Sequence, residues 1–286
     1  METNDTEGDQ ATFAILRPCL LLLILMACTQ RTSESKTIKH QLTYSPFIPK
    51  SALAKAPPAK KKKKKKIYLT FDDGPNRGTS KVLHIVQEEK VPVTFFIVGE
   101  HVFASTAQHA VWDSLKIDST IELCNHSHTH AHDHYRRFYK NTEGVVNDFR
   151  RCQDSLQLSN NIARAPGRNI WRVDTLSFTD LSKSAAAADS LQNAGFAIIG
   201  WDLEWHYDHK TFTLKNKSDE ILQQIDSLFT HNKTRIPENL VLLAHDQVYY
   251  DEDDSCELHQ LIKKLKARAD YELEIVSNYP GMKQPK

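Results

Sequence analysis

From Lys66 onward, short apolar segments rich in β-branched and aromatic residues alternate with longer segments whose apolar positions have helical spacing. The apolar segments predict seven strands, which read IYLTF, VTFFIVG, IELCN, NIARAP, FAIIGWDL, LVLLAHD and LEIVSNY. The helix-compatible segments between them cover residues 79–90, 102–116, 142–157, 184–194, 218–231 and 256–268. Apolar strands that alternate with helices are typical of a parallel sheet covered by helices. The pattern predicts an α/β fold, a distorted or incomplete (β/α) barrel with a single catalytic domain.

Polar side chains follow nearly every predicted strand, at the end where such barrels carry their active sites. In chain order these are Asp72 and Asp73, the run HSHTHAHDH, Arg164 and Gly167, the run WDLEW, and His245 with Asp246. Segments that are distant in the sequence therefore supply one polar cluster on an apolar scaffold, and this cluster is the predicted site.

Two adjacent carboxylates, Asp72 and Asp73, end the first predicted strand. Charges of the same sign this close repel each other, so the pair requires a positive partner. The histidines after the third strand stand at positions 126, 128, 130, 132 and 134. A histidine pair spaced i, i+4 converges on one ion, and one carboxylate completes an open three-ligand zinc site. We expect a divalent metal that binds one aspartate and leaves the other free to act as a base; a surface tract that binds metal by composition alone is the alternative.

The N-terminal segment, residues 1–28, contains an apolar stretch shorter than the roughly 18–20 residues that span a bilayer. It has the pattern of a signal peptide, and the sequence up to Cys28 resembles a bacterial lipoprotein processing site. An uncleaved membrane anchor is the alternative. Both interpretations predict an exported protein of the cell envelope, tethered to the membrane with its catalytic part outside the cytoplasm.

Residues 29–66 predict a flexible tether that ends in a run of seven lysines, and residues 281–286 form a short tail after the domain, residues 67–280. The lysine run favours a solvated spacer, with binding to acidic lipids or an anionic polymer as the alternative. Lys plus Arg total 37 against 36 for Asp plus Glu, which gives no reason to expect nucleic-acid binding. Cys124, Cys152 and Cys256 remain after the leader, so they can form at most one intramolecular disulfide.

Four stretches resemble the motifs of a known family, and they occur in that family's order. They read TFDDG from Thr70, HSHTH from His126, RAPG from Arg164 and LLAHD from Leu242. Over about residues 66–279, the chain resembles the polysaccharide deacetylases of the NodB-homology type, carbohydrate esterase family four. The fold of that family is a distorted (β/α) barrel, which agrees with the strand pattern.

The resemblance implies that Asp73, His126 and His130 bind the metal and that Asp72 is the general base. The same histidine spacing recurs two residues later, from His128, but Asn125 before His126 favours the first register. In that register, the histidines at 128, 132 and 134 are expected to face solvent.

The resemblance also implies that His245 is the general acid and that Arg164 pairs with Asp72 and keeps it ionised. A backbone N–H near Gly167 or Arg168 would stabilise the oxyanion that forms when water attacks an acetyl carbonyl.

The fourth motif departs from the family pattern D-x-x-D-W, because the chain reads WDLEWHYD. Asp202 or Asp208 would be the carboxylate that orients the acid histidine, and Asp246 is a further supporting residue. Trp205 would form a wall of the sugar-binding groove, whereas Trp201 fits a core or a groove position equally well.

The resemblance thus implies a metal-dependent hydrolase that removes N-acetyl groups from a GlcNAc-containing polysaccharide such as peptidoglycan, a surface polymer or chitin-like oligomers. Two histidines and a carboxylate suit Zn²⁺, with Co²⁺, Ni²⁺ and Fe²⁺ as alternatives. The same residues fit an O-acetyl esterase acting on acetylated xylan. The altered fourth motif leaves open a sugar-binding protein without catalytic activity.

Overall fold

The most apolar segments of the chain form the centre of one sheet. In β1 (Lys65–Gly74) the residues from Ile67 to Asp72 are buried, and in β2 (Val93–Ile97) every residue is buried. The computed structural model describes residues 63–282, all of which belong to the unit Pro58–Lys286. The predicted signal peptide and nearly all of the predicted tether lie outside the described residues.

The remaining strands are short, as expected for a sheet that bends sharply. They are β3 (Ile121–Asn125), β4 (Ile162–Ala163), β5 (Ile170–Val173), β6 (Leu176–Thr179), β7 (Ala197–Ile198), β8 (Leu203–Glu204), β9 (Tyr207–Asp208), β10 (Thr213–Leu214), β11 (Asn239–His245) and β12 (Tyr271–Leu273).

The main sheet has the order β6-β5-β7-β4-β3-β2-β1-β11-β8, and β12 pairs with the beginning of β1. The pairs from β7 through β1 to β8 are parallel, whereas β5 pairs antiparallel with both β6 and β7. The order ends at β6 and β8, which do not pair with each other within the described residues. The sheet is therefore a curled, incomplete barrel, which confirms the predicted α/β class.

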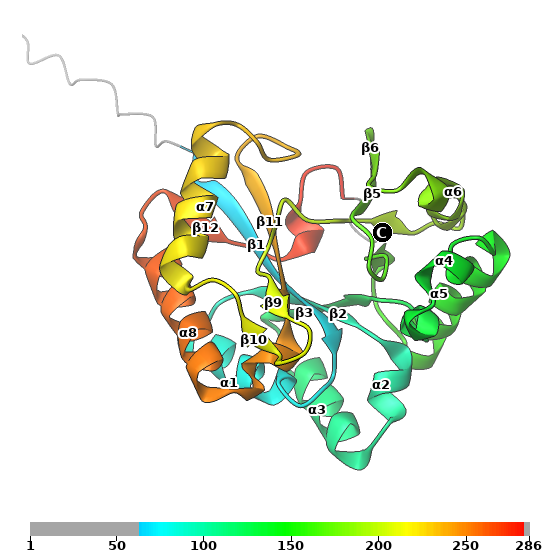
Figure 1. Ribbon diagram of the computed structural model, residues 1–286, viewed down its shortest axis with the longest axis horizontal. Coiled ribbons are helices and arrows are strands. Elements are labelled where there is room, and N and C mark those ends of the chain that lie inside the picture. Colours follow the sequence, from blue (N-terminus) through cyan, green and yellow to red (C-terminus); the bar gives the residue numbers. More distant parts are fainter. Residues whose placement is uncertain (1–62, 283–286) are drawn as a thin grey trace, which may run out of the picture. The chain divides into compact units, whose positions relative to one another are not determined.

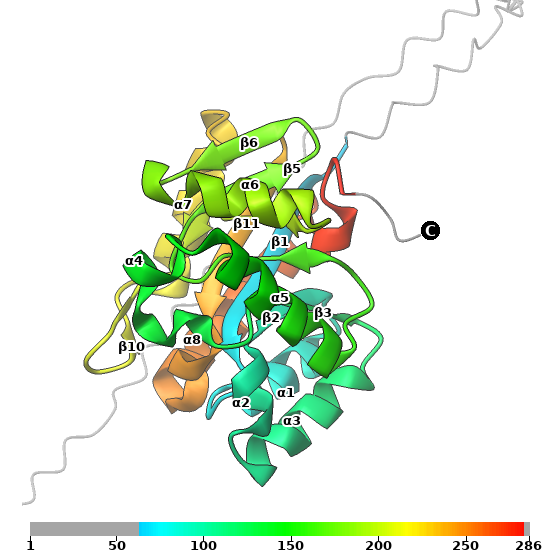
Figure 2. The same cartoon turned by 90° about the vertical axis from the view of Figure 1, so that its right-hand side faces the viewer.

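Helices surround this sheet on its outer side, as Figure 1 shows for α7, α8, α1, α3 and α2 in turn. Their bounds are α1 (Thr79–Glu89), α2 (Gly99–Phe103), α3 (Thr106–Lys116), α4 (Tyr135–Phe138), α5 (Thr142–Leu156), α6 (Ala185–Asn193), α7 (Ser218–Thr230) and α8 (Glu252–Ala267). Figure 2 shows the β5–β6 hairpin and α6 at one end of the sheet and α1, α2 and α3 at the other. Among the described residues, no helix has the length and apolar character needed to cross a membrane.

Three predicted elements differ from the structure. The predicted strand FAIIGWDL is divided into β7, which pairs with β4, and β8, which pairs with β11. The predicted helix 102–116 is interrupted at Ser105, whose hydroxyl accepts a hydrogen bond from the Gln108 N–H and begins α3 as an N-cap. The last predicted strand begins two residues too late, because β12 is Tyr271–Leu273 and Val276–Asn278 forms a 3₁₀ turn. The β5–β6 hairpin was not predicted as such.

The three cysteines of the described residues are free. Cys124 and Cys152 are buried, and Cys256 is exposed on α8. The disulfide that the sequence allowed among these three does not form.

Candidate active site and metal centre

A β-bulge at the end of β1 explains how two adjacent aspartates serve one site. Phe71 pairs with Phe95 and Gly74 with Ile97, so β1 carries one extra residue between these pairs. Asp73 lies at this bulge with a left-handed backbone, φ 72°. Bulges redirect side chains near active sites, and aspartate tolerates the left-handed region better than most residues. Alternation along an ideal strand would have sent the two carboxylates to opposite faces.

The loop after β3 positions the histidines through local hydrogen bonds. The side-chain oxygen of Asn125 accepts from the Ser127 N–H at 2.9 Å, and the Ser127 hydroxyl accepts from the His130 N–H at 3.0 Å. Residues 130–133 all have left-handed backbones, with φ of 49°, 57°, 43° and 59°. Such non-glycine conformations cost energy and occur most often at functional sites.

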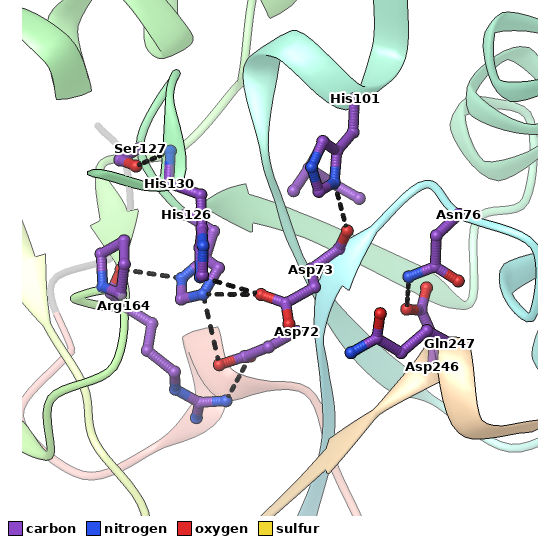
Figure 3. Close-up of polar contacts among 12 residues, drawn as sticks. Asp72, Asp73, Asn76, His101, His126, Ser127, His130, Arg164, Asp246 and Gln247 are labelled. Atoms are coloured by element: carbon purple, nitrogen blue, oxygen red, sulfur yellow. Dashed lines mark hydrogen bonds and ion pairs between the residues drawn. The ribbon is translucent and has the colours of Figure 1, made fainter. Parts of the chain in front are cut away.

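Asp73, His126 and His130 bring one ligand atom each to a common point (Figure 3), and these atoms lie within 4.8 Å of one another. Oδ1 of Asp73 lies 3.4 Å from Nε2 of His126 and 3.1 Å from Nε2 of His130. Nδ1 of His126 lies 3.0 Å from the carbonyl oxygen of Arg164. A carbonyl only accepts, so Nδ1 carries the proton and Nε2 presents its lone pair to the cluster.

The charges of this cluster are strongly coupled. Burial acts to raise the pKa of Asp73, but its contacts with His126 and His130 outweigh burial and hold that pKa well below the usual value. Burial acts to lower the pKa of His130, but Asp73 outweighs it and raises that pKa. The carboxylate is therefore ionised and favours positive charge in its immediate surroundings.

Asp72 lies beside this cluster and is held by a buried arginine. Nη1 of Arg164 donates to Oδ1 of Asp72 at 2.8 Å and to the Thr70 hydroxyl at 2.7 Å. Its other nitrogens donate to the carbonyl oxygens of Ile199 and Gly200. Burial lowers the pKa of Arg164, an effect that Asp72 opposes. The second carboxylate oxygen of Asp72 lies 3.6 Å from Nε2 of His126 and therefore faces the cluster.

His245 reaches the same place from the neighbouring strand. In the parallel pairing of β1 with β11, His245 is the partner of Asp72. The centre of its ring lies 5.1 Å from that of Tyr207. Its Nδ1 is buried and has no hydrogen-bond partner among the described residues.

These side chains surround one cavity of about 530 Å³. Its lining residues are Asp72, Asp73, His101, His126, His130, Asp133, Tyr135, Gly167, Trp201, Glu204, Tyr207, His209, Phe212, Leu243, His245 and Gln247. The prediction from the sequence did not include Tyr135, Tyr207, His101 or Glu204. Nδ1 of His101 lies 2.7 Å from the backbone oxygen of Asp73, which ties α2 to the bulge.

The predicted partners of His245 in the fourth motif are wrong. The carboxylate of Asp202 accepts from the N–H groups of Arg235 and Val241, close to the beginning of β11. His245 ends that strand four residues later, about 13 Å away. The carboxylate of Asp208 accepts from the N–H groups of residues 210 and 211 within its own turn.

Asp246 also bonds away from the cavity, to side chains near the beginning of α1. Its carboxylate accepts from the amide of Asn76, as Figure 3 shows, and from the hydroxyl of Thr79. Burial raises its pKa to about 7. We infer that Asp246 fixes the loop after β1 to the loop after β11.

The predicted position of Trp205 in the wall of the groove is wrong. Trp205 is 1% exposed, packs in the main core cluster against Tyr249, and donates its indole N–H to the Asn216 carbonyl. Trp201 lines the cavity. Trp201 precedes β8 and Trp205 follows it.

Gly167 lines the cavity, whereas Arg168 does not. The backbone N–H of Arg168 donates to the Ala165 carbonyl at 3.2 Å, so it is not available to an oxyanion. The backbone N–H of Gly167 has no such bond within the described residues. Of the two backbone N–H groups predicted to stabilise an oxyanion, only that of Gly167 is available within the described residues.

The other loop histidines do not join the cluster. His132 and His134 are exposed, as expected. His128 is only 4% exposed and lies against Gly99, so its predicted solvent-facing position is wrong. Its backbone N–H is held by Asp148, and burial lowers its pKa. The cluster therefore uses the register that begins at His126.

A second acidic group with histidine, formed by Glu88, Glu89 and His259, has a simpler explanation. Nζ of Lys266 lies 2.7 Å from the Glu89 carboxylate, and Nζ of Lys263 lies 3.8 Å from it. Positive side chains already neutralise this group, so it needs no metal.

Comparison with known proteins decides the family. The profile described as polysaccharide deacetylase matches residues 59–193. Over that range the chain matches the polysaccharide deacetylase family. This confirms the resemblance carried by the four motifs and places the enzyme among hydrolases that act on acetyl groups.

Among curated relatives, the chain is 27% identical over 203 residues to the peptidoglycan-N-acetylglucosamine deacetylase of Bacillus cereus. The match covers 69% of this chain and 66% of that relative.

Solved structures show the same fold at low identity. A Streptococcus mutans CE4 esterase has a TM-score of 0.55 at 24% identity, covering 74% of this chain and 86% of its own. The catalytic domain of peptidoglycan N-acetylglucosamine deacetylase from Eubacterium rectale has a TM-score of 0.54 at 19% identity, covering 78% and 93%.

Proposed function

We propose that this polysaccharide deacetylase is a metal-dependent enzyme that hydrolyses N-acetyl groups on a GlcNAc-containing polysaccharide. The observation that carries the proposal is the convergence of Asp73, His126 and His130 on one point, with Asp72 beside them and outside the triad. The names of the relatives support acetylated amino sugars as the substrate class.

The residues at this point fit a divalent cation. Oδ1 of Asp73 is buried and accepts no hydrogen bond within the described residues, although two imidazole nitrogens lie close to it. Two imidazoles and a carboxylate form a three-ligand set that suits zinc and leaves a position open. We therefore assign the ligands to Asp73, His126 and His130 and favour Zn²⁺, with Co²⁺, Ni²⁺ or Fe²⁺ able to occupy the same set.

The chemistry that such a cation supplies when bound is polarisation of the acetyl carbonyl and a lower pKa for water. Asp72 is the general base in this proposal and takes a proton from the attacking water. Arg164 keeps the Asp72 carboxylate oriented through the hydrogen bond from Nη1 to Oδ1. The Gly167 N–H would stabilise negative charge on the carbonyl oxygen.

Departure of the sugar amine requires a proton, because an unprotonated amine is a poor leaving group. His245 is the only predicted acid that lies across the β1–β11 pair from Asp72 and lines the cavity. We assign it the role of general acid, with Tyr207 packed against its ring. The products are acetate and a glucosamine unit.

Acetate release by the purified chain tests the proposal. Peptidoglycan, chitin oligomers and acetylated xylan are compared, with added zinc or cobalt and after treatment with a chelator. We expect release from the N-acetylated glycans, loss of release on chelation and recovery with metal. Release from acetylxylan alone would favour an O-acetyl esterase, and release that chelation does not change would contradict metal dependence.

We also propose that the enzyme is exported and tethered to the envelope through Cys28, a residue outside the described part of the chain. The lipoprotein-like sequence before Cys28 supports this. Fractionation of cells that express the native chain or Cys28→Ala checks it. Loss of the membrane-bound fraction in the variant is expected, and an unchanged distribution would contradict lipid attachment.

A further inference from the structure

A second cavity, of about 700 Å³, adjoins the candidate active site and is strongly basic. It is lined by Asp133, His134, Tyr135, Arg136, Arg137, Lys140 and Arg168. Four of these side chains are permanent cations, and one is an acid. The chain as a whole has a formal net charge of only +1, so this concentration of positive charge is local.

The four cations are available to a ligand. Within the described residues, none of them forms an ion pair, whereas Arg172 and Arg268 pair with aspartates at 2.8 and 3.0 Å. Nη1 of Arg168 donates to the Gly167 carbonyl at 3.0 Å, and its Nε is buried without a hydrogen-bond partner. A guanidinium that is anchored by one nitrogen and has unused donors is suited to bind an anion.

The basic cavity and the active-site cavity share a wall, formed by Asp133 and Tyr135. The ring of Tyr135 lies against Gly167, since a Cβ at that glycine would lie 3.1 Å from it. The centre of the same ring lies 5.7 Å from that of His130. A glycan chain with one sugar at the proposed metal centre would therefore bring its neighbouring residue to the basic cavity.

We propose that the basic cavity binds a carboxylate on the sugar next to the one that is deacetylated, and that the preferred substrate is therefore an acidic polysaccharide. The proposal rests on the proposed function, because it uses that site to place the acetylated sugar. The carboxylate could belong to a lactyl ether or its peptide, as in peptidoglycan, or to a uronic acid. Both present the same planar anion to the arginines.

The test compares glycans that differ only in charge. Soluble peptidoglycan fragments and uronic-acid-containing GlcNAc oligomers are used as isolated and after amidation of their carboxylates, with neutral GlcNAc oligomers of the same length. The variants are Arg168→Gln and the triple variant Arg136→Gln/Arg137→Gln/Lys140→Gln. Arg150→Gln on α5 is the matched control, because Arg150 is exposed and lies outside this lining.

For the preferred acidic glycan, we expect each cavity variant to raise KM by roughly tenfold, with kcat nearly unchanged, since a remote contact contributes mainly to binding. Amidation should have the same effect on the native enzyme, and the variants should then show no further loss. The control should behave as native protein on every glycan. Peptidoglycan fragments and uronic oligomers are then compared. The source of the carboxylate is the one of these two glycans on which amidation raises KM more.

Equal losses on acidic and neutral glycans, or no preference for the acidic form in the native enzyme, would overturn the proposal. Binding of the same glycans, measured by calorimetry with Asp72→Asn protein, provides a readout without turnover. Tight binding of the acidic form that the cavity variants weaken, together with no acetate release by the native enzyme, would retain the anion site and reject the proposed reaction. Binding that ignores charge would reject the anion site, whatever the activity.

Discussion

The two sides of the active-site cavity differ in how their polar groups are held. On the side formed by the ends of β1 and β3, two functional side chains have fixed partners: Asp72 has Arg164, and His126 has a backbone carbonyl. On the side formed by β11 and the β9–β10 hairpin, Nδ1 of His245 is buried without a partner among the described residues. The predicted carboxylate partner of His245 bonds elsewhere.

This difference follows from the chemistry that we assign to each side. A cation requires fixed ligands, whose orientation other groups must hold. A general acid must lose and regain a proton in each turnover. Within the described residues, Nδ1 of His245 has no hydrogen-bond partner, and packing next to the Tyr207 ring holds the side chain instead.

The largest expected effects separate the two aspartates. Asp72→Asn should lower turnover by about 10³-fold or more, because it removes the base, while metal content stays near one per chain. His126→Ala should lose the metal itself. Metal analysis and acetate release on both purified variants check this, with melting curves as the control for folding. Equal metal loss in the two variants would reverse the assignment of the aspartates.

Loss of the acid should have a smaller and substrate-dependent effect. His245→Ala should retain metal and lose roughly 10²-fold or more in turnover of N-acetyl substrates. The loss on an activated acetyl ester should be much smaller, since a good leaving group needs no proton. Rates on the two substrates measure the difference, and similar losses on both would contradict the acid role.

The two tryptophans distinguish core from cavity. Trp205→Ala should lower the free energy of unfolding by about 3–5 kcal/mol, because it empties a buried core position. Trp201→Ala should leave stability nearly unchanged and raise KM for glycans. Chemical denaturation and steady-state kinetics measure the two effects. A destabilised Trp201→Ala protein with normal KM would place Trp201 in the core instead.

A further effect concerns a buried carboxylate outside the cluster. Burial raises the pKa of Asp246 from 3.8 to about 7, whereas the histidine contacts of Asp73 lower its pKa. Between pH 3.8 and about 7, the folded protein keeps a proton on Asp246 that the unfolded chain has released. This contribution to stability is complete below pH 3.8 and is lost as the pH rises through 7, by at most about 1.4 kcal/mol per pH unit.

Asp246→Asn should therefore show a flatter dependence of unfolding free energy on pH than the native chain. Urea denaturation from about pH 4 to 8 measures both proteins. Parallel pH profiles for the two proteins would show that Asp246 titrates normally.

Contiguous motifs made one side of the site predictable from the sequence. TFDDG and HSHTH each place their functional atoms within one strand end and its loop, so local spacing was sufficient. The seven strand segments predicted the sheet because buried parallel strands are apolar throughout. Even here, the bulge that turns Asp72 and Asp73 toward one histidine depends on pairing with β2.

The other side depends on pairing between distant segments. Trp201 lines the cavity and Trp205 is buried in the core, and β8 between them is placed by pairing with β11, which lies nearly forty residues later in the chain. Tyr135 reaches the site because it packs on Gly167. Asp202 is not a partner of His245 because its carboxylate binds near the beginning of β11, whereas His245 ends that strand.

Anomalous diffraction from crystals grown with zinc tests the central claim most directly. The account predicts one strong peak bound by Oδ1 of Asp73 and by Nε2 of His126 and His130, at about 2.0–2.2 Å, with Asp72 outside bonding distance. A peak at Glu89 and His259, or an ion that Asp72 binds in place of Asp73, would contradict it.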